Sequence, residues 1–312
     1  MGSSPARVLV TGLNGFTGQH LRPALERAGY EVHGTVRAGE HVDSTLHVAE
    51  LSDVEALRAV IDRVAPRHVI HLAAVSFVAH EDVEAIYRTN IVGTRNLLQA
   101  LATSCVAPTL GTVLLASSAN VYGNAVVDPI GETVPLQPAN DYAVSKAAME
   151  QMSALWSQAL PLTLVRPFNY TGVGQSEQFL IPKIVHGFAQ RSDALELGNL
   201  DVHRDFSDVR DVVEVYASLL EISPRGVFNV CSERAHTLHE VISMVADLSG
   251  HQLEIRVNPC FVRTNEVRIL RGSAERLRLV LPDWKPRALR ETLRWMIEAA
   301  RFGQLENRTA SS

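Results

Sequence analysis

Apolar residues in the first half of the chain follow two alternating patterns. Short, nearly continuous apolar runs are typical of strands that are buried on both faces of a sheet. Longer segments between them repeat apolar residues every three or four positions, which predicts helices. The predicted strands are residues 7–11, 31–36, 68–72, 112–117 and 162–166, and the predicted helices are one that ends near residue 28, followed by residues 53–65, 82–102 and 142–159. Because strands and helices alternate, we expect an α/β fold with a doubly wound parallel sheet.

This alternation ends after residue 166. Residues 167–200 are rich in loop-forming residues and contain one predicted helix, at 182–190. A helix is expected at 209–220, and a strand at 227–230 could return to the first sheet. The segments 237–248, 253–257, 274–280 and 288–302 then predict a smaller α+β region, and the polar residues after 304 predict a frayed tail.

Two of the predicted helices begin with the spacing of a capping box, in which a hydroxyl residue precedes a glutamate by three positions. Ser52 with Glu55 marks the start of the helix at 53–65. Thr237 with Glu240 marks the start of the helix that ends near residue 248.

The composition is that of an ordinary globular protein. The chain has 312 residues, of which 46% are hydrophobic, so it can form a proper core and is not a disordered or collagen-like chain. Its 29 basic and 34 acidic side chains give a net charge of −5, which does not suggest a nucleic-acid partner. No apolar run approaches the roughly 18 residues that a membrane span needs, and the first residues lack the apolar region of a signal peptide.

Cysteine and histidine give no metal-site pattern. Cys105, Cys231 and Cys260 are odd in number and far apart, which favours the reducing cytoplasm over a disulfide framework. His236 and His239 could share one side of a helix start, but no third ligand is patterned around them. We therefore expect a cytoplasmic protein with no metal site and with neither nucleic acid nor membrane as a partner.

A glycine-rich turn joins the first strand to the first helix. Gly12, Gly15 and Gly18 form a G-x-x-G-x-x-G spacing there. Glycines at such a turn let backbone N–H groups approach a pyrophosphate at the helix N-terminus. The spacing indicates a dinucleotide site, and an ordinary strand-to-helix turn is the alternative interpretation.

The end of the second strand bears on the choice of cofactor. An acid at this position binds the ribose 2′-hydroxyl of NAD, whereas an arginine accepts the 2′-phosphate of NADP. No carboxylate stands at the tip of the strand, and Arg37 does. This favours NADPH, with NAD left open and with Arg37 as a solvated loop residue as the alternative interpretation.

Tyr142 and Lys146 form a Tyr-x-x-x-Lys pair on one side of a predicted helix. A nearby ammonium stabilises a phenolate, so we expect it to lower the pKa of Tyr142 and make it a general acid or base near neutrality. Ser118 follows the strand at 112–117, at the sheet edge where ligands bind, and its hydroxyl could donate to a substrate carbonyl. The alternatives are a surface lysine beside a half-buried tyrosine, and a serine that caps a turn.

Taken together, the glycine turn, Ser118 and the Tyr-x-x-x-Lys pair resemble the extended short-chain dehydrogenase/reductases. The resemblance implies that Ser118, Tyr142 and Lys146 are the catalytic trio, with Lys146 also holding the nicotinamide ribose. It covers nearly the whole chain and includes a His-Leu-Ala-Ala motif at residues 71–74 and a central-helix Asn. Glu50 stands where the family has an aspartate that contacts adenine. The implied cofactor contacts are Gly12, Asn14, Gly15, Phe16, Thr17, Gly18, Arg37, Glu50, Leu51, Leu72, Ala73, Ala74, Asn90, Tyr142 and Lys146.

The resemblance also implies a domain organisation. A Rossmann domain that binds NADP is expected over residues 5–166, with residues 207–230 returning to it. Residues 167–206 and 231–304 would form the nucleotide-sugar domain, and 305–312 a flexible tail. The resemblance also implies a homodimer through the helices at 82–102 and 142–159, which are apolar on more than one side, as either core packing or an interface would require.

Motifs in the second half resemble the branch of this family that modifies nucleotide sugars. These motifs are residues 166–175, residues 204–211, the Asn-Val-Cys at 229–231 and the segment that begins at Arg263. Arginine suits such a substrate because its planar fork binds phosphate through two hydrogen bonds, although each arginine alone could simply form a surface ion pair. The implied substrate contacts are Ser76, Ser118, Asn120, Asn169, Lys183, Arg204, Arg263 and Glu266.

The residues after Ser118 narrow the choice of reaction. Dehydratases of this branch carry an acidic pair at the positions that Ala119 and Asn120 occupy here. An amide cannot abstract the C5 proton, so dehydration is disfavoured. The motifs most resemble the GDP-4-keto-6-deoxy-D-mannose reductases, which implies NADPH-dependent reduction of a C4 ketone to GDP-D-rhamnose or GDP-6-deoxy-D-talose. The alternatives are an NAD-dependent 4-epimerase of nucleotide sugars, a GDP-mannose 4,6-dehydratase and a non-enzymatic protein that senses dinucleotides.

Overall fold

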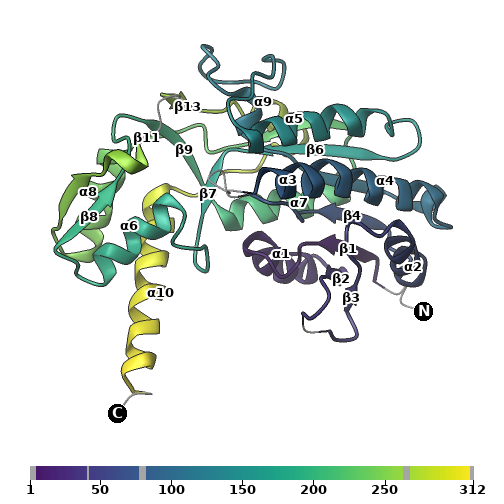
Figure 1. Cartoon of the computed structure of the whole chain (residues 1–312), viewed down its shortest axis with the longest axis horizontal. Helices are drawn as coiled ribbons and strands as arrows, with labels where there is room; N and C mark the ends of the chain where they lie inside the picture. The colour runs from purple at the N-terminus through teal and green to yellow at the C-terminus, as the bar shows by residue number, and fades with distance from the viewer. Residues whose placement is uncertain (1–4, 41, 77–81, 263–267, 310–312) are drawn as a thin grey trace.

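The computed structural model describes residues 5–40, 42–76, 82–262 and 268–309, with side chains through Phe302. A seven-stranded sheet lies at its centre, in the order β10-β6-β5-β4-β1-β2-β3 (Figure 1). Every neighbouring pair in this sheet is parallel. The strands are β1 (Arg7–Thr11), β2 (Glu31–Val36), β3 (Leu46–Val48), β4 (His68–His71), β5 (Thr112–Ala116), β6 (Leu162–Pro167) and β10 (Gly226–Val230). The expected α/β fold with a doubly wound parallel sheet is confirmed.

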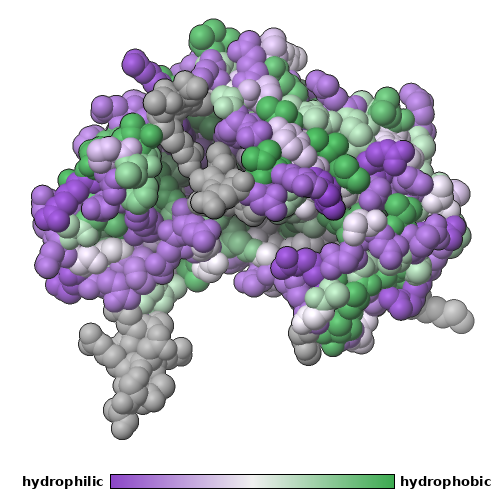
Figure 2. Space-filling view, viewed as in Figure 1, coloured by the Kyte–Doolittle hydropathy of each residue, from purple (hydrophilic) through white to green (hydrophobic). Residues whose placement is uncertain are grey.

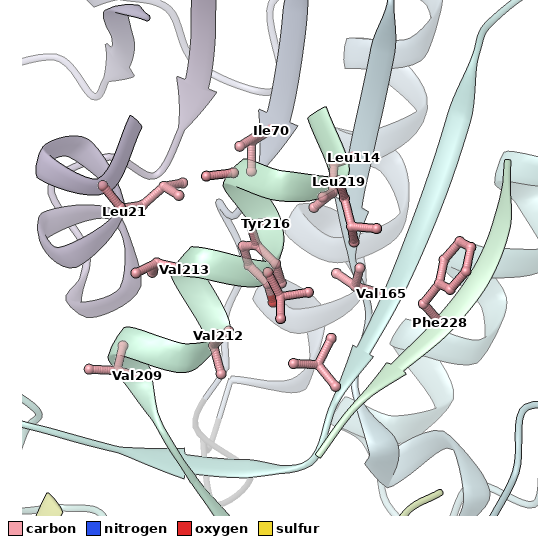
Figure 3. Packing of buried hydrophobic residues seen from close by; sticks show 14 of the residues in the cluster. Leu21, Ile70, Leu114, Val165, Val209, Val212, Val213, Tyr216, Leu219 and Phe228 are labelled. Carbon is pink, nitrogen blue, oxygen red and sulfur yellow. The ribbon is translucent and has the colours of Figure 1, made fainter. Parts of the chain in front are cut away.

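Helices cover both faces of this sheet. On one face, α1 (Phe16–Arg27) and α7 (Val209–Ile222) bury apolar side chains against the strands. Figure 3 shows this core, with Tyr216 and Leu219 of α7 near Leu114 and Val165 of the sheet. The other face is covered by α2 (Val54–Val64), α4 (Thr94–Thr103) and α5 (Asp141–Ala154), which form a second apolar cluster. Because both faces are covered, the strands carry the continuous apolar runs that predicted them.

The helix predicted at 82–102 is interrupted by a π-helical turn. It consists of α3 (Val83–Tyr87), the π-helical segment η1 (Arg88–Gly93) and α4. Asn90 lies in η1, and its buried side chain makes hydrogen bonds outside the helix. A buried amide must find such partners, and single π-helical turns are frequent at functional sites.

Two helix boundaries also differ from the predictions. The helix predicted at 142–159 ends at Ala154 as α5, and residues 155–159 form turns in which Leu155 is 83% exposed. The N-cap of α2 is Asp53 rather than Ser52, because the Asp53 carboxylate accepts the hydrogen bond of the Ala56 N–H. The capping box of Thr237 is confirmed, at the start of α8 (Leu238–Ser249).

The rest of the chain forms a smaller α+β part beside the carboxyl ends of the strands (Figure 1). The third apolar cluster of the molecule lies in this part, among α6 (Leu180–Ala189), α8 and α10 (Leu289–Thr309). Its strands are β7 (Asn169–Thr171), β8 (Ala194–Leu197), β9 (His203–Asp208), β11 (Ala235–Thr237), β12 (Glu254–Val257) and β13 (Ile269–Leu270). Its helices are α6 (Leu180–Ala189), α8 (Leu238–Ser249), α9 (Glu275–Val280) and α10 (Leu289–Thr309), and the short helices of the chain are η2 (Ala107–Thr109), η3 (Ala119–Tyr122) and η4 (Pro259–Phe261).

The last helix is longer than the sequence pattern predicts. α10 continues to Thr309, so most of the segment expected as a frayed tail is helical. Residues 304–308 contain Gln, Leu, Glu and Arg, which are good helix formers even without an apolar stripe. Within the ranges described above, none of the helices combines the length and the apolar character needed to cross a bilayer.

Candidate active site

The three expected catalytic residues come together at the carboxyl end of β5. Ser118 follows this strand as the N-cap of η3, where its Oγ accepts the Asn120 N–H at 3.2 Å. Tyr142 lies in the first turn of α5, and its phenol is hydrogen-bonded to Ser118. Lys146 lies one turn further, and its Nζ donates to the carbonyl oxygen of Ala116 at 2.8 Å. All three side chains are buried, which removes competing water from their polar groups.

The expected lowering of the Tyr142 pKa is wrong for this structure. Burial raises the pKa of Tyr142 to about 12, and the hydrogen bond with Ser118 only partly opposes this. The ammonium of Lys146 is bonded to a backbone carbonyl on β5. The phenol is therefore protonated at neutral pH, which is the form that can donate a proton to a substrate oxygen.

Lys146 is itself perturbed by its surroundings. Burial lowers the pKa of Lys146 to about 8, and the negative charge of Glu150 opposes this shift. Glu150 lies one helical turn after Lys146 on α5 and forms a buried ion pair with Arg166 of β6, with Nε and Oε1 2.9 Å apart. The sequence interpretation did not include Glu150, although its i+4 spacing from Lys146 was visible.

The glycine turn has the geometry that a dinucleotide needs. Gly12 adopts a φ of +74°, and a Cβ atom there would lie 2.8 Å from the backbone nitrogen of Ala73. A Cβ on Gly18 would lie 2.6 Å from the carbonyl oxygen of Gly12. The first turn of α1 has Gly15 as its N-cap, which offers no side chain to the free N–H groups. These N–H groups suit a pyrophosphate, so the residues present fit the expected cofactor.

An aromatic contact joins this turn to the smaller part of the molecule. The Tyr170 ring of β7 stacks on Phe16, with the ring centroids 6.1 Å apart. The hydroxyl groups of Tyr170 and Thr17 are hydrogen-bonded at 2.8 Å. Tyr170 was not among the expected site residues, because its partners lie about 150 positions away in the sequence.

The tip of the second strand differs from the sequence interpretation. A carboxylate does reach this place, because Glu40 folds back toward β2. Its Oε1 accepts the Arg37 Nε–H at 2.9 Å, and its Oε2 accepts the Asn14 Nδ2–H at 3.0 Å. Glu50, expected beside the adenine, accepts the Ala38 N–H at 3.1 Å. The adjacent Leu51 packs against Gly93 of η1.

Asn90 connects the loop after β4 to the catalytic helix. Its amide pairs with the backbone N–H and carbonyl of Val75 at 2.9 and 3.1 Å, and donates to the Ser145 hydroxyl at 2.9 Å. The structure thus gives Asn90 a positioning role between two segments. In the loop that it holds, Leu72, Ala73 and Ala74 are half-buried and Ser76 is exposed.

The expected substrate residues lie on several elements. Asn120 is half-buried beside Ser118, and the Asn169 Nδ2 lies 3.5 Å from the carbonyl oxygen of Asp205 on the paired strand β9. Arg204 donates to the carbonyl oxygens of His203 and Arg268. Lys183 of α6 lies over the Phe261 ring, 4.4 Å from its centroid, and donates to the carbonyl of Glu196. Arg263 and Glu266 lie outside the described residues.

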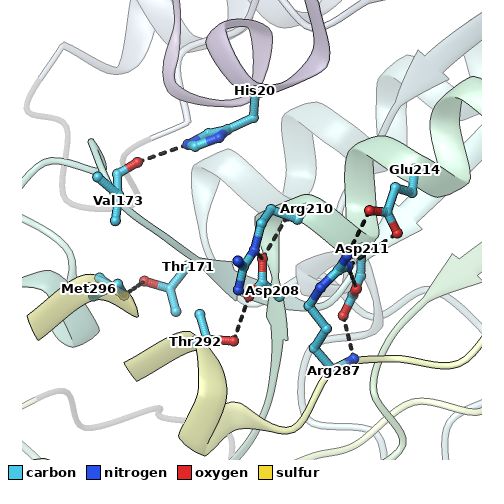
Figure 4. A network of polar contacts seen from close by, with 10 residues as sticks. All are labelled: His20, Thr171, Val173, Asp208, Arg210, Asp211, Glu214, Arg287, Thr292 and Met296. Carbon is cyan, nitrogen blue, oxygen red and sulfur yellow. Dashed lines mark hydrogen bonds and ion pairs between the residues drawn. The ribbon is translucent and has the colours of Figure 1, made fainter. Parts of the chain in front are cut away.

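A hydrogen bond and a set of ion pairs hold the start of α7 to the C-terminal segment (Figure 4). Asp208, fully buried, accepts hydrogen bonds from Arg210 and from the Thr292 hydroxyl at 2.7 Å. Asp211, also buried, pairs with Arg287, whose Nη2 lies 2.8 Å from Glu214. Burial raises the pKa of Asp211 to about 6, although Arg287 opposes this shift.

The same figure shows a contact between the glycine-turn helix and the segment after β7. His20 of α1 hydrogen-bonds the carbonyl oxygen of Val173 at 2.8 Å. In the part of the chain that the structure describes, no cluster of three or more His, Cys, Asp or Glu side chains could hold a metal ion.

The fold and this site define an enzyme of the extended short-chain dehydrogenase/reductase class. Residues 9–296 match the family model described as GDP-mannose 4,6 dehydratase, and the chain belongs to this family.

Two characterised relatives have names that refer to GDP-linked deoxysugars. The chain is 33% identical to GDP-6-deoxy-D-talose 4-dehydrogenase of Aggregatibacter actinomycetemcomitans, over 88% of this chain and 91% of the relative. It is 35% identical to GDP-6-deoxy-D-mannose reductase of Pseudomonas aeruginosa, over 92% of this chain and 95% of the relative.

Solved structures give the same picture of the fold. A crystal structure of a candidate epimerase from Burkholderia cenocepacia J2315 is 47% identical, with a TM-score of 0.90 over 96% of this chain and all of that one. The structure of RMD from Pseudomonas aeruginosa complexed with NADPH is 33% identical, with a TM-score of 0.84 over 96% of this chain and 99% of that one.

Proposed function

We propose that this protein is an NADPH-dependent reductase of the C4 ketone of a nucleotide-linked 4-keto-6-deoxyhexose. The proposed substrate is GDP-4-keto-6-deoxy-D-mannose, and the product is GDP-D-rhamnose or GDP-6-deoxy-D-talose. One observation carries the proposal: a buried, protonated Tyr142 stands beside Ser118, and the next two residues, Ala119 and Asn120, bear no carboxylate. The site can donate a proton to a ketone but lacks the acid that dehydration would need there.

The cofactor would lie along the glycine turn and the end of β5. The N–H groups at the start of α1 would hold the pyrophosphate, and Tyr142 and Lys146 would face the nicotinamide ribose. When bound, NADPH supplies the hydride that reduces the ketone. Support for this cofactor comes from the fit of the glycine turn and from the NADPH complex of the Pseudomonas aeruginosa structure.

The side chains of the trio then have distinct tasks. The Ser118 hydroxyl donates a hydrogen bond to the C4 oxygen and stabilises the negative charge that develops on it. Tyr142 donates its phenolic proton to the same oxygen. The Lys146 ammonium stabilises the phenolate that remains, and Glu150, with Arg166 behind it, favours the charged form of the lysine.

The substrate class rests on the arginines and on the relatives. Arg204 and Arg263 offer the planar forks that suit a diphosphate. Asn169, Lys183 and Glu266 would complete the contacts with the sugar nucleotide. Both characterised relatives carry GDP-linked 6-deoxyhexoses in their names, which supports guanine as the base.

An NAD-dependent 4-epimerase is the second candidate, and one observation favours it. Glu40 brings a carboxylate to the tip of the second strand, where an acid would bind the 2′-hydroxyl of NAD. An epimerase oxidises and re-reduces the same carbon, so it consumes no cofactor overall. Net cofactor consumption therefore separates the two candidates.

The test uses the purified protein with GDP-4-keto-6-deoxy-D-mannose and either NADPH or NADH. We expect one NADPH to be oxidised for each ketone reduced, with a GDP-6-deoxyhexose identified by NMR. Interconversion of C4 epimers without cofactor consumption would favour the epimerase. If the protein dehydrates GDP-mannose and leaves the 4-ketone unreduced, the dehydratase is the better interpretation. If it binds the dinucleotide without any reaction, a sensor is favoured. Tyr142→Phe serves as the inactive control.

We also propose a homodimer through α5 and the neighbouring η1 segment. Val92 of η1 is 50% exposed and Val144 of α5 is 38% exposed, on two elements that pack against each other. Figure 2 shows apolar side chains among polar ones over the region where Figure 1 places α3, α4 and α5. Light scattering should give twice the mass of one chain, and the double variant Val92→Asp with Val144→Asp should give a monomer.

The proposed location is the cytoplasm. Cys105, Cys231 and Cys260 are all free thiols in the structure, as expected for a reducing compartment. Nucleotide cofactors and nucleotide sugars are also available there. Fractionation of cells that express the protein tests this proposal.

A further inference from the structure

We propose that Glu40 determines how strongly this protein distinguishes NADPH from NADH. Its carboxylate lies between Asn14 and Arg37, where it competes with the 2′-phosphate of NADPH and can accept the 2′-hydroxyl of NADH. The inference rests on the proposed use of a nicotinamide dinucleotide at the glycine turn.

The position of Glu40 follows from the pairing of two strands. β1 and β2 are parallel neighbours, with Thr11 opposite Thr35, so the glycine turn after β1 lies beside the loop after β2. Asn14 belongs to the turn and Arg37 to the loop. Ligand groups attached to the adenosine ribose bind at this place in a doubly wound sheet.

The two donors converge on the two oxygens of one carboxylate. The Arg37 Nε lies 2.9 Å from Oε1 of Glu40, and the Asn14 Nδ2 lies 3.0 Å from Oε2. These bonds hold the pKa of Glu40 below its usual range, so the group is an anion at neutral pH. A guanidinium and an amide that both donate to one anion form a small anion site, and the same donors suit a phosphate monoester.

Two hydrogen bonds of backbone N–H groups hold the loop that carries Arg37 and Glu40. The Ala38 N–H donates to the Glu50 carboxylate, and the Glu40 N–H donates to the Arg37 carbonyl at 3.2 Å. The Arg37 side chain is 80% exposed. A bound 2′-phosphate can reach Arg37 from solvent, but it then lies beside the Glu40 carboxylate, which holds the Arg37 Nε and repels the phosphate.

The consequence is that Arg37 alone does not set the cofactor preference. With Glu40 in place, the 2′-phosphate of NADPH can bind the Arg37 guanidinium but is repelled by the negative charge of Glu40. The 2′-hydroxyl of NADH has no charge to pair with Arg37, but it can donate a hydrogen bond to the Glu40 carboxylate. We infer that the natural chain binds both cofactors with a modest preference for NADPH, and that removing the Glu40 charge increases this preference.

The test measures nucleotide binding without sugar chemistry. Calorimetry of the full chain compares adenosine 2′,5′-bisphosphate with 5′-AMP, which lacks the 2′-phosphate. We expect Glu40→Gln, which keeps the size of the side chain, to tighten the bisphosphate about fivefold and to leave 5′-AMP within about twofold. Glu254→Gln is the matched control, because Glu254 forms a similar exposed pair with Arg256 on β12 and should change neither affinity. Arg37→Gln should weaken the bisphosphate alone.

The results that would overturn the inference differ from those that would overturn the proposed function. An unchanged ratio of the two affinities in Glu40→Gln overturns the inference, and so does a weaker affinity for the bisphosphate, which would show that Glu40 only orients Arg37. Failure of the natural chain to bind either nucleotide overturns both this inference and the proposed function. A shifted ratio in a protein that reduces no sugar ketone would support the inference and reject the proposed function alone.

Discussion

The cofactor part of this protein and its junction with the sugar part position their polar groups in different ways. In the cofactor part, the key groups come from short stretches, such as the turn that begins at Gly12 and the α5 turn between Tyr142 and Lys146. At the junction with the sugar part, they come from distant segments, such as Asp208 with Thr292 and Asp211 with Arg287. The first arrangement is specified by local spacing, whereas the second depends on the completed fold.

The sharpest test of the cofactor part is Tyr142→Phe. Removing the phenolic hydroxyl takes away the proton donor while the ring still fills its buried site. We expect the turnover of the ketone to fall about a thousandfold, with NADPH affinity within about twofold of the natural value. Stopped-flow turnover and NADPH fluorescence titration measure the two quantities. Turnover within about tenfold of the natural chain would mean that another group donates the proton.

The corresponding test of the junction is Arg287→Met. It leaves the buried Asp211 carboxylate without its ion pair, so we expect the free energy of unfolding to fall by about 3 kcal/mol. Urea unfolding followed by fluorescence gives this value. Arg290→Met is the control, since Arg290 and Asp247 form an exposed pair 3.6 Å apart, and it should cost about 0.5 kcal/mol or less. Equal losses in the two variants would refute the role given to the buried pair.

Gly12→Ala tests whether local geometry sets cofactor binding. A Cβ at this positive φ would press on the backbone of Ala73 in the loop after β4. We expect NADPH affinity to weaken at least about thirtyfold. Gly29→Ala is a matched control, because Gly29 also has a positive φ but nothing lies within 4 Å of the added Cβ. Gly29→Ala should cost some stability and leave NADPH affinity unchanged, and loss of affinity in both variants would point to strain alone.

The pH dependence gives the smallest expected effect. Because burial lowers the pKa of Lys146 to about 8, its ammonium is present below that pH and is lost above it. The phenol of Tyr142, with a pKa of about 12, does not titrate in this range. We therefore expect kcat/KM for the ketone to fall about tenfold between pH 8.5 and 9.5. A profile that stays flat to pH 10 would show that the Lys146 charge is not needed.

The sequence predicted six of the seven strands of the central sheet, because strands that are buried on both faces carry continuous apolar runs; it missed β3, which is an edge strand of only three residues. It did not predict β9, because this strand has only one apolar residue, Phe206, and is built into the fold by contacts from β7, β11 and β13. The extension of α10 to Thr309 was not predicted, since helix formers without an apolar stripe give no periodic signal.

At the site, the spacing of Tyr142 and Lys146 and the position of Ser118 were enough to bring the trio to one place. Glu40 and Tyr170 could not be found in this way. Glu40 reaches Asn14 because β1 and β2 are neighbours, and Tyr170 reaches Thr17 across about 150 positions only in the completed fold. The lowered pKa expected for Tyr142 failed for a related reason, because burial of the phenol outweighs what the neighbouring residues supply.

The central claim is that the site transfers hydride to C4 of a GDP-linked ketone, and isotope transfer tests it most directly. The protein is incubated with GDP-4-keto-6-deoxy-D-mannose and NADPH that carries deuterium at the reactive carbon of the nicotinamide. The product is then examined by NMR. We predict a GDP-6-deoxyhexose with one deuterium at C4 for each NADPH oxidised. A product without deuterium at C4, or a ketone that persists while NADPH is not consumed, would contradict the account.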